Sequence, residues 1–204
     1  MRKIAIIGAS GHGKVVADIA KKNDYDDCVF LDDNEEVKLC GSFPVVGKCD
    51  DFSMFSDRDF VVAIGNADIR EKIQVKLTNS GIRMATLIHP SAVVADSVTV
   101  GEGTVVMAGA VINPEVSIGK GVIINTCASV DHDCIIGDYV HVSVGANISG
   151  TVEVGNKTWV GVNAAVSNNV KICGNCMIGA GAVVIRDIDK AGTYIGVPAK
   201  IYNR

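Results

Sequence analysis

Residues 116–136 read VSIGKGVIINTCASVDHDCII, in which every sixth residue, counted from Ile118, is isoleucine or valine. The same six-residue phase extends without a slip from Ile88 to Val184. A small or β-branched residue follows each of these positions by four residues. Self-similarity at a fixed short period is the signature of a repeat architecture. The sequence therefore predicts a solenoid of stacked, nearly identical coils from about residue 88 onward.

The six-residue spacing also predicts the shape of each coil. The small residue of one repeat and the aliphatic residue that opens the next are two positions apart, so both face the same side of a short strand, which we take as the inner side. Two further places make a turn, where glycine can adopt a positive φ angle. Such glycines stand at Gly103, Gly109, Gly121, Gly145 and Gly181. Three repeats close one triangular coil, and coils stacked about 4.8 Å apart form parallel sheets.

Before residue 88 the pattern changes to strands that alternate with helices. The segment Lys3–Gly13 reads as a buried strand that runs into a glycine turn, and a helix is expected over 14–22. Apolar runs at 28–31 and 60–64 predict two more strands, and the second opens a polar helix over 67–77. Strands that alternate with helices indicate a small parallel sheet.

Together these patterns predict an α/β plus all-β fold class. A small Rossmann-like parallel α/β domain is expected over residues 1–84, followed by a parallel β-helix of hexapeptide repeats over residues 85–204 that ends in a short C-terminal tail.

Composition excludes several classes of partner. The 19 Lys and Arg residues against 23 Asp and Glu give a net charge of −4, and no basic run is present, so nucleic acid is not expected as a partner. No apolar stretch approaches the length of a membrane span, so we expect no membrane insertion and a cytoplasmic location.

The seven cysteines are interpreted as reduced thiols. The single C-x-x-C, Cys173–Cys176, leaves the repeat undisturbed, and no metal site is predicted.

The glycine turn Gly8–Gly13 has the spacing G-x-x-G-x-G between a strand and a helix. Main-chain N–H groups at such a turn can bind phosphate at the helix N-terminus. Asp32 and Asp33 end the next strand, and Gly65 ends the third. Because ligands bind beyond the carboxyl ends of parallel strands, these residues predict a nucleotide site. The alternative is a glycine turn that serves only tight packing.

His132 and Asp133 occupy the turn of one repeat and should point outward from a corner of the coil. An adjacent carboxylate can raise the basicity of an imidazole, as a general base requires, although a surface histidine without a role is the alternative. His141 also faces outward but lies half a coil away, so the two histidines can share a site only between subunits. Three-fold packing of the β-helices would create three such clefts. The outward Trp159 is interpreted as an inter-subunit contact.

Several stretches carry a resemblance to a known family: Gly8–Gly13, Phe30–Asp33, Ala63–Asn66, Asn125–Ala146 and Gly196–Lys200. Through them the chain resembles the NeuD/PglD-type family of sialic acid and bacillosamine acetyltransferases, which are hexapeptide-repeat acyltransferases. Within that family it is most similar to the UDP-N-acetylbacillosamine N-acetyltransferases. The resemblance implies a left-handed β-helix that binds acetyl-CoA as co-substrate, an N-terminal domain that binds a UDP-amino-sugar, and a homotrimer with inter-subunit active sites.

The resemblance also implies a role for each matching residue. His132 would be the general base, and Asp133, where the family has glutamate, would raise its basicity. Substrate would be bound by these residues: Ser10, Gly11 and His12 at the phosphates, Asp32 and Asp33 at the uracil, Gly65 at the nucleotide rim, and Asn125 beside the sugar. Acetyl-CoA would be bound by His141 at the thioester and by the backbone of Gly150, Val162 and Ala180 at the pantetheine, Ala180 replacing a glycine.

The implied reaction is acetylation of the 4-amino group of a UDP-linked 4-amino-4,6-dideoxy-N-acetylhexosamine, giving a UDP-N,N′-diacetylbacillosamine-type product. A positioned base suffices for direct transfer from the thioester, without a serine or cysteine nucleophile. One alternative is an O-acetyltransferase of sialic acid or another glycan, against which Asp32 and Asp33 argue for a nucleotide-linked acceptor. The others are an NAD-dependent oxidoreductase, disfavoured by the glycine spacing, and a non-catalytic scaffold, which would be indifferent to His132→Ala.

Overall fold

The computed structural model describes residues 1–202 and divides into two compact units between Pro90 and Ser91. This division falls a few residues after the boundary expected at residue 84. The reason is that Met84 and Ala85 still pair with the first sheet: Met84 forms a parallel bridge to Phe60, and the Ala85 N–H donates to the Phe60 carbonyl. Each unit is described by itself.

The first unit contains β1 (Arg2–Ile7), α1 (Gly11–Lys22), β2 (Tyr25–Leu31), β3 (Leu39–Cys40), β4 (Phe43–Gly47), the 3₁₀ helix η1 (Cys49–Phe55), β5 (Asp59–Val62), α2 (Ala67–Asn79) and β6 (Leu87–Ile88). Its sheet has the order β3-β4-β2-β1-β5, with β1 parallel to both β2 and β5. The parallel sheet predicted from the sequence is therefore present.

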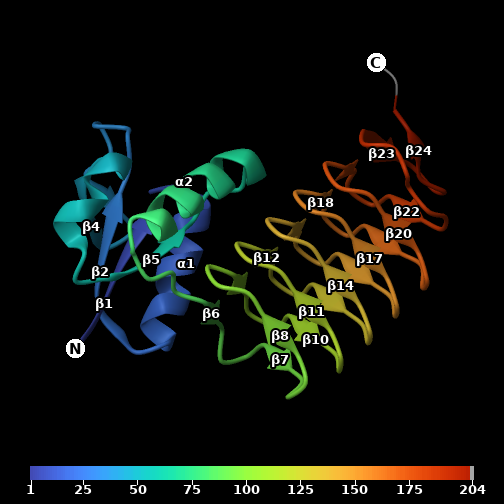
Figure 1. Ribbon diagram of the computed structural model, residues 1–204, viewed down its shortest axis with the longest axis horizontal. Coiled ribbons are helices and arrows are strands. Elements are labelled where there is room, and N and C mark those ends of the chain that lie inside the picture. The colour runs from blue at the N-terminus through green and yellow to red at the C-terminus, as the bar shows by residue number, and fades with distance from the viewer. Residues whose placement is uncertain (203–204) are drawn as a thin grey trace. The chain divides into compact units, whose positions relative to one another are not determined.

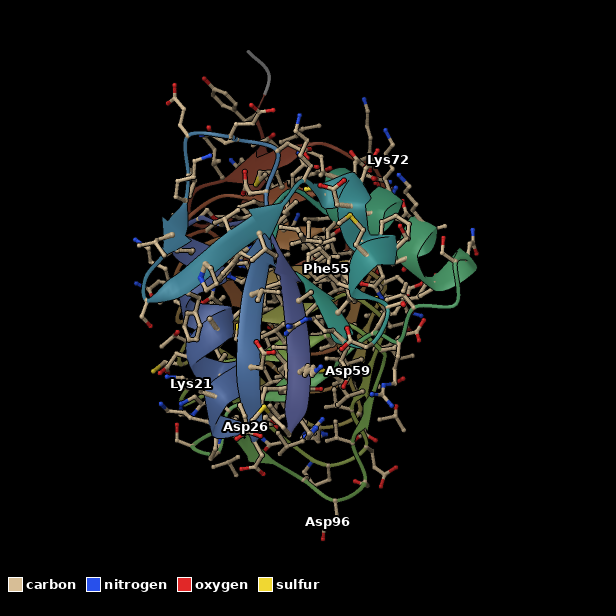
Figure 2. All side chains as sticks on the ribbon, turned by 90° about the vertical axis from the view of Figure 1, so that its left-hand side faces the viewer. Lys21, Asp26, Phe55, Asp59, Lys72 and Asp96 are labelled. Carbon is tan, nitrogen blue, oxygen red and sulfur yellow. The ribbon has the colours of Figure 1, made fainter. Side chains whose placement is uncertain are left out.

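The sheet is buried at its centre, because β1, β2 and β5 are short, nearly continuous apolar runs. Ile4 to Ile7 are fully buried, and α1 packs Val16 and Ile19 inward. Figure 2 labels Asp26 and Asp59, which lie at the beginnings of β2 and β5. The glycine turn and the aspartates after β2 lie at the opposite, carboxyl end of the sheet.

Some elements differ from the sequence expectation. Helix α1 begins at Gly11 rather than at Lys14, because residues 11–13, which were expected in the glycine turn, already form the first turn of the helix. Strand β4, which pairs with β3 on one side and β2 on the other, was not predicted. Pro44 argues against a strand, and the alternating burial of β4 leaves it without a continuous apolar run. Helix α2 runs to Asn79, beyond the expected end at Leu77.

The second unit is a parallel β-helix (Figure 1). Its strands are β7 (Val93–Val94), β8 (Thr99–Val100), β9 (Val105–Val106), β10 (Val111–Ile112), β11 (Ser117–Ile118), β12 (Ile123–Ile124), β13 (Ser129–Val130), β14 (Ile135–Ile136), β15 (His141–Val142), β16 (Asn147–Ile148), β17 (Glu153–Val154), β18 (Trp159–Val160), β19 (Ala165–Val166), β20 (Lys171–Ile172), β21 (Met177–Ile178), β22 (Val183–Val184), β23 (Thr193–Ile195) and β24 (Lys200–Ile201).

The strands form three faces. One face has the order β22-β19-β16-β13-β10-β7, the second β20-β17-β14-β11-β8, and the third runs β24-β23-β21-β18-β15-β12-β9 within this unit. The phase of the repeat is as predicted: the second residue of each strand from β7 to β22 is the recurring isoleucine or valine. In the middle coils these residues and the small residues four places later are buried, as Ile124 and Ala128 illustrate.

The turns adopt the predicted conformation, and not only at glycine. Positive φ angles occur at the expected glycines and also at non-glycine residues in the same place of the repeat, among them Asp133 at 58° and Tyr139 at 58°. The repeat therefore imposes a left-handed backbone on whatever residue occupies this place, at a cost of about 1–2 kcal/mol for a side chain other than glycine. Among the described residues, no helix is long and apolar enough to cross a membrane.

Candidate functional site

The glycine turn between β1 and α1 is closely packed. A Cβ atom at Gly13 would lie 2.2 Å from the carbonyl oxygen of Gly8, and one at Gly8, whose φ is 107°, would lie 2.9 Å from the carbonyl oxygen of Ala63. These two glycines are therefore required by close backbone approach. The contact with Ala63 places the turn against the segment that follows β5, so the ends of β1 and β5 meet as predicted.

The first turn of α1 leaves its main-chain donors open. The N-cap residue Ser10 makes no side-chain cap bond, and the first intrahelical bond runs from the Lys14 N–H to the Ser10 carbonyl. The N–H groups of Gly11 and His12 have no acceptor within residues 1–202. Because the helix dipole adds positive charge here, these groups can bind an anion.

Asp32 and Asp33 lie beside this turn at the end of β2. Asp32 accepts the Ala9 N–H through Oδ2 (2.6 Å) and the Asn34 N–H through Oδ1 (2.9 Å). Asp33 accepts the Cys49 N–H through Oδ1 (3.0 Å). Both carboxylates thus shape the loops around the site. Asp32 also lines a hollow of about 320 Å³ with Lys38, Val45, Gly47 and Lys48 among its other walls.

His12 is the most perturbed titratable group of this site. Burial, reinforced by the nearby charge of Arg70, lowers the pKa of His12 to about 4, so its imidazole is neutral at physiological pH. Its Nε2 atom is buried and has no hydrogen-bond partner among the described residues. Arg70, on α2, is 1% exposed and was not singled out in the sequence, because it stands in an otherwise polar helix.

The second cluster surrounds His132, in the turn between β13 and β14. Its Nδ1 lies 2.7 Å from Asp133 Oδ2. Because a carboxylate can only accept, Nδ1 donates, and the lone pair of the neutral ring is left on Nε2. This hydrogen bond and the charge of Asp131 raise the pKa of His132 above its usual value. His132 is exposed, and this arrangement can serve a general base.

Two contacts orient His132 further. Its main-chain N–H donates to Asp131 Oδ1 (2.8 Å), which also accepts from Asn113 Nδ2 (2.7 Å) one coil earlier. On the next coil, a Cβ atom at Gly150 would lie 2.6 Å from the His132 ring, so Gly150 leaves room for the imidazole. The predicted residues His132, Asp133 and Gly150 are therefore brought together. Asp131 and Asn113 were missed, although their places in the repeat predict their proximity.

A third cluster lies on the face formed by β12, β15 and β18. Asn125 Nδ2 lies 3.0 Å from His141 Nε2, and the His141 ring packs on Trp159 with ring centroids 4.5 Å apart. Trp159 Nε1 donates to Ser143 Oγ at 2.6 Å. Asn125 and His141 are thus in contact, but His141 lies on a strand of a different face from the corner that carries His132.

The last two residues predicted to bind acetyl-CoA, Val162 and Ala180, are on the surface. Val162 and Ala180 are exposed and lie one coil apart, in the turns after β18 and β21. Cys173 and Cys176 have their Sγ atoms 3.6 Å apart as free thiols. Within the described part of the chain, no three His, Cys, Asp or Glu side chains are grouped so that they could hold a metal ion.

Comparison with known proteins adds to this geometry. Residues 3–77 match the family model of the PglD N-terminal domain. The acetyltransferase domain of PglB from Neisseria gonorrhoeae FA1090, solved in complex with acetyl coenzyme A, is 40% identical, with 98% of this chain and 99% of that chain covered and a TM-score of 0.96. The chain belongs to the PglD-type family of sugar N-acetyltransferases.

Two other relatives are associated with different sugar nucleotides, one through its bound ligand and one through its name. PerB from Caulobacter crescentus, solved in complex with CoA and GDP-perosamine, is 38% identical, with 100% of this chain and 98% of that chain covered and a TM-score of 0.95. The UDP-N-acetylbacillosamine N-acetyltransferase of Bacillus subtilis (strain 168) is 38% identical over 112 residues, and the match spans 52% of this chain and 52% of that relative. This chain thus matches about half the length of that curated relative.

Membership in this family confirms three predictions from the sequence. The family itself was identified correctly, the fold is a Rossmann-like unit followed by a left-handed β-helix, and the class of enzyme is a sugar N-acetyltransferase.

Proposed function

We propose that this protein transfers the acetyl group of acetyl-CoA to the 4-amino group of a nucleotide-linked 4-amino-4,6-dideoxy sugar. Acetyl-CoA as the donor is supported by the complexes of two relatives with acetyl-CoA or CoA. A nucleotide-linked amino sugar as the acceptor is supported by the relatives that act on bacillosamine or perosamine nucleotides. We retain UDP-N-acetylbacillosamine-type sugar as the first substrate to test.

The observation that carries the proposal is the bond between His132 Nδ1 and Asp133 Oδ2, 2.7 Å long. It leaves Nε2 as the basic atom on an exposed corner. A sugar amine attacks the thioester carbonyl and becomes positively charged as the tetrahedral intermediate forms. Nε2 takes a proton from that nitrogen, and the CoA thiolate leaves, taking up a proton to become the free thiol. No covalent acetyl-enzyme is needed.

The residues of the N-terminal unit are proposed to hold the nucleotide. The open N–H groups of Gly11 and His12 suit the phosphates, with Ser10 at the helix start. Asp32, Asp33 and Gly65 lie at the same carboxyl edge of the sheet and are assigned to the base and the nucleotide rim. The hollow beside Asp32 has the polar and aliphatic lining that a nucleoside needs.

The acetyl-CoA residues are proposed to face His132 across a subunit boundary. Asn125 and His141 are in contact with each other, whereas His132 belongs to a corner between two other faces. A homotrimer would join His132 of one copy to Asn125, His141, Val162 and Ala180 of a second, while Gly150 lies beside His132 in its own chain. Mixing inactive His132→Ala and His141→Ala proteins through subunit exchange should then restore part of the activity, because some clefts regain both histidines.

The substrate is tested by free-thiol release from acetyl-CoA with matched acceptors. Reaction with the UDP-linked 4-amino sugar, and not with the same sugar bearing a 4-hydroxyl group, supports the proposal. Faster reaction with GDP-perosamine would retain N-acetylation as the reaction and would replace uracil by guanine as the nucleobase of the substrate. Reaction only with free sialic acids would replace it with O-acetylation, and no thiol release with any acceptor would contradict it.

A further inference from the structure

Arg70 is an unusual residue at the edge of the N-terminal unit that we assign to nucleotide binding. Its side chain is 1% exposed although it is charged, and it lies on α2, in the first turns after the end of β5. Removing a charge from water is costly, so a buried guanidinium needs hydrogen bonds that compensate for the lost hydration.

Arg70 Nη1 donates to two consecutive main-chain carbonyls, those of Ile64 and Gly65, each at 2.8 Å. A trans peptide group is planar and carries its C=O and N–H on opposite sides. The amide that shares a plane with the Ile64 carbonyl is that of Gly65, and the amide paired with the Gly65 carbonyl is that of Asn66. With both carbonyls turned toward Arg70, the N–H groups of Gly65 and Asn66 point away from it.

These two N–H groups are open. Neither has a hydrogen-bond acceptor among the described residues, and the Asn66 side chain is itself occupied as the N-cap of α2, accepting the Ile69 N–H at 3.0 Å. Two successive amides directed to one side form a concave donor pair of the kind that binds anions.

The Gly65–Asn66 turn lies next to the glycine turn. Gly8 is so close to Ala63 and Ile64 that a Cβ atom there would lie 2.9 Å and 3.0 Å from their atoms. Two sets of open main-chain donors therefore meet at this edge, those of Gly11 and His12 at α1 and those of the Gly65–Asn66 turn. The buried, unpartnered Nε2 of His12 is an independent sign of a ligand here, since buried polar atoms normally have partners.

We propose that Arg70 is a positioning residue for nucleotide binding, which turns the Ile64 and Gly65 carbonyls inward so that the amides of Gly65 and Asn66 bind the diphosphate of the sugar nucleotide. This inference rests on the proposed function. The amides at α1 would hold one phosphate and those of the Gly65–Asn66 turn the other. Asp32, the acidic side chain beside the glycine turn, already accepts two main-chain N–H groups with its two oxygens.

The test is the affinity for UDP and for GDP, measured by calorimetry on the full chain. Arg70→Met removes the donors and should weaken binding of the preferred nucleotide at least about tenfold, a loss of about 1.4 kcal/mol. The KM for acetyl-CoA should stay unchanged. Arg70→Gln keeps an N–H donor for the carbonyls without the charge, and it should recover most of the lost affinity.

Gln74 provides the matched control. It is on the same helix one turn later and equally buried at 1% exposure. Gln74→Met should leave nucleotide affinity unchanged, so a loss in both methionine variants would mean a general loosening of α2 and would overturn the inference. Equal weakening in Arg70→Gln and Arg70→Met would also overturn it, because charge rather than carbonyl orientation would then matter.

A measurement on the wild type does not depend on the variants folding. On titration with the bound nucleotide, the amide resonances of Gly65 and Asn66 should move in the nuclear magnetic resonance spectrum. If these resonances stay fixed while those of Gly11 and His12 move, the inference fails and the nucleotide site stands. If neither UDP nor GDP binds the wild type, the inference and the nucleotide part of the proposed function both fail.

Discussion

The two candidate regions, the N-terminal edge and the His132 corner, differ in the kind of chemical group that they offer. At the N-terminal edge the available donors are main-chain N–H groups, held open by glycines and by the buried Arg70. At the His132 corner the reactive groups are side chains, displayed by a turn whose backbone is the same in every coil. In the function that we propose, the aperiodic loops bind the nucleotide through main-chain groups, and the repeat carries the general base as a side chain.

The largest effect is expected where the repeat presents the base. In Gly150→Ala the new Cβ would stand 2.6 Å from the His132 ring, so the ring must move. Displacement of a catalytic group by about 1 Å lowers kcat by about 100-fold. The control is Gly192→Ala, whose Cβ would have no neighbour nearer than 3.5 Å. Steady-state kinetics with near wild-type kcat for Gly150→Ala would break the assigned geometry of this corner.

The next effect concerns the main-chain site. In Gly13→Ala the new Cβ would be 2.2 Å from the Gly8 carbonyl oxygen, so the glycine turn must open. We expect a loss of about 1–3 kcal/mol in unfolding free energy and weaker UDP binding. The control is again Gly192→Ala, whose Cβ would have no neighbour nearer than 3.5 Å and which should bind UDP normally. Denaturant unfolding and calorimetry measure both, and equal behaviour of the two variants would contradict the packing argument.

A smaller effect is expected at Asp133, and it appears in the pH profile. Activity should rise with pH as His132 loses its proton. The hydrogen bond to Asp133 raises the pKa of His132 above its usual value. Asp133→Asn removes the carboxylate, so the acid limb should move to lower pH. A weaker base should lower the plateau by about tenfold. An acid limb that stays in place, measured as kcat/KM against pH, would show that another group titrates.

The smallest effect is expected at Asp131, where one substitution removes the charge but keeps the hydrogen bond to His132. Asp131→Asn keeps an acceptor for the His132 N–H but loses the charge that also raises the His132 pKa. We expect a small shift of the acid limb to lower pH with little change in plateau. Asn113→Ala should instead lower the plateau, because Asp131 loses its 2.7 Å anchor. Asp138→Asn, a similar corner carboxylate that accepts the Lys120 N–H, should change neither quantity.

The repeat made the second unit predictable from the sequence. Because the phase fixes which residues face inward, it located the strands from Val94 to Val184 and placed His132 and Asp133 on an outer corner. It also predicted the positive φ of the turns. The glycine pattern did not show that Asp133, which is not a glycine, adopts the same conformation, with a φ of 58°.

The N-terminal site was less predictable, for a physical reason. A main-chain N–H group is present whatever the side chain is, so no sequence pattern identified the Asn66 N–H as an open donor. Arg70 is separated from the glycine turn by more than fifty residues of sequence and lies in a helix without apolar periodicity. Its contact with the Gly65 carbonyl depends on the tertiary packing of α2, which no local pattern encodes.

The most direct test of the central claim is free-thiol release from acetyl-CoA by the wild type and by His132→Ala, with a UDP-linked 4-amino-4,6-dideoxy sugar as acceptor. Loss of a general base should reduce kcat by about 10²–10⁴-fold, while acetyl-CoA and UDP still bind. His132→Ala protein that binds both ligands and releases thiol at nearly the wild-type rate would contradict the assignment of His132 as the base.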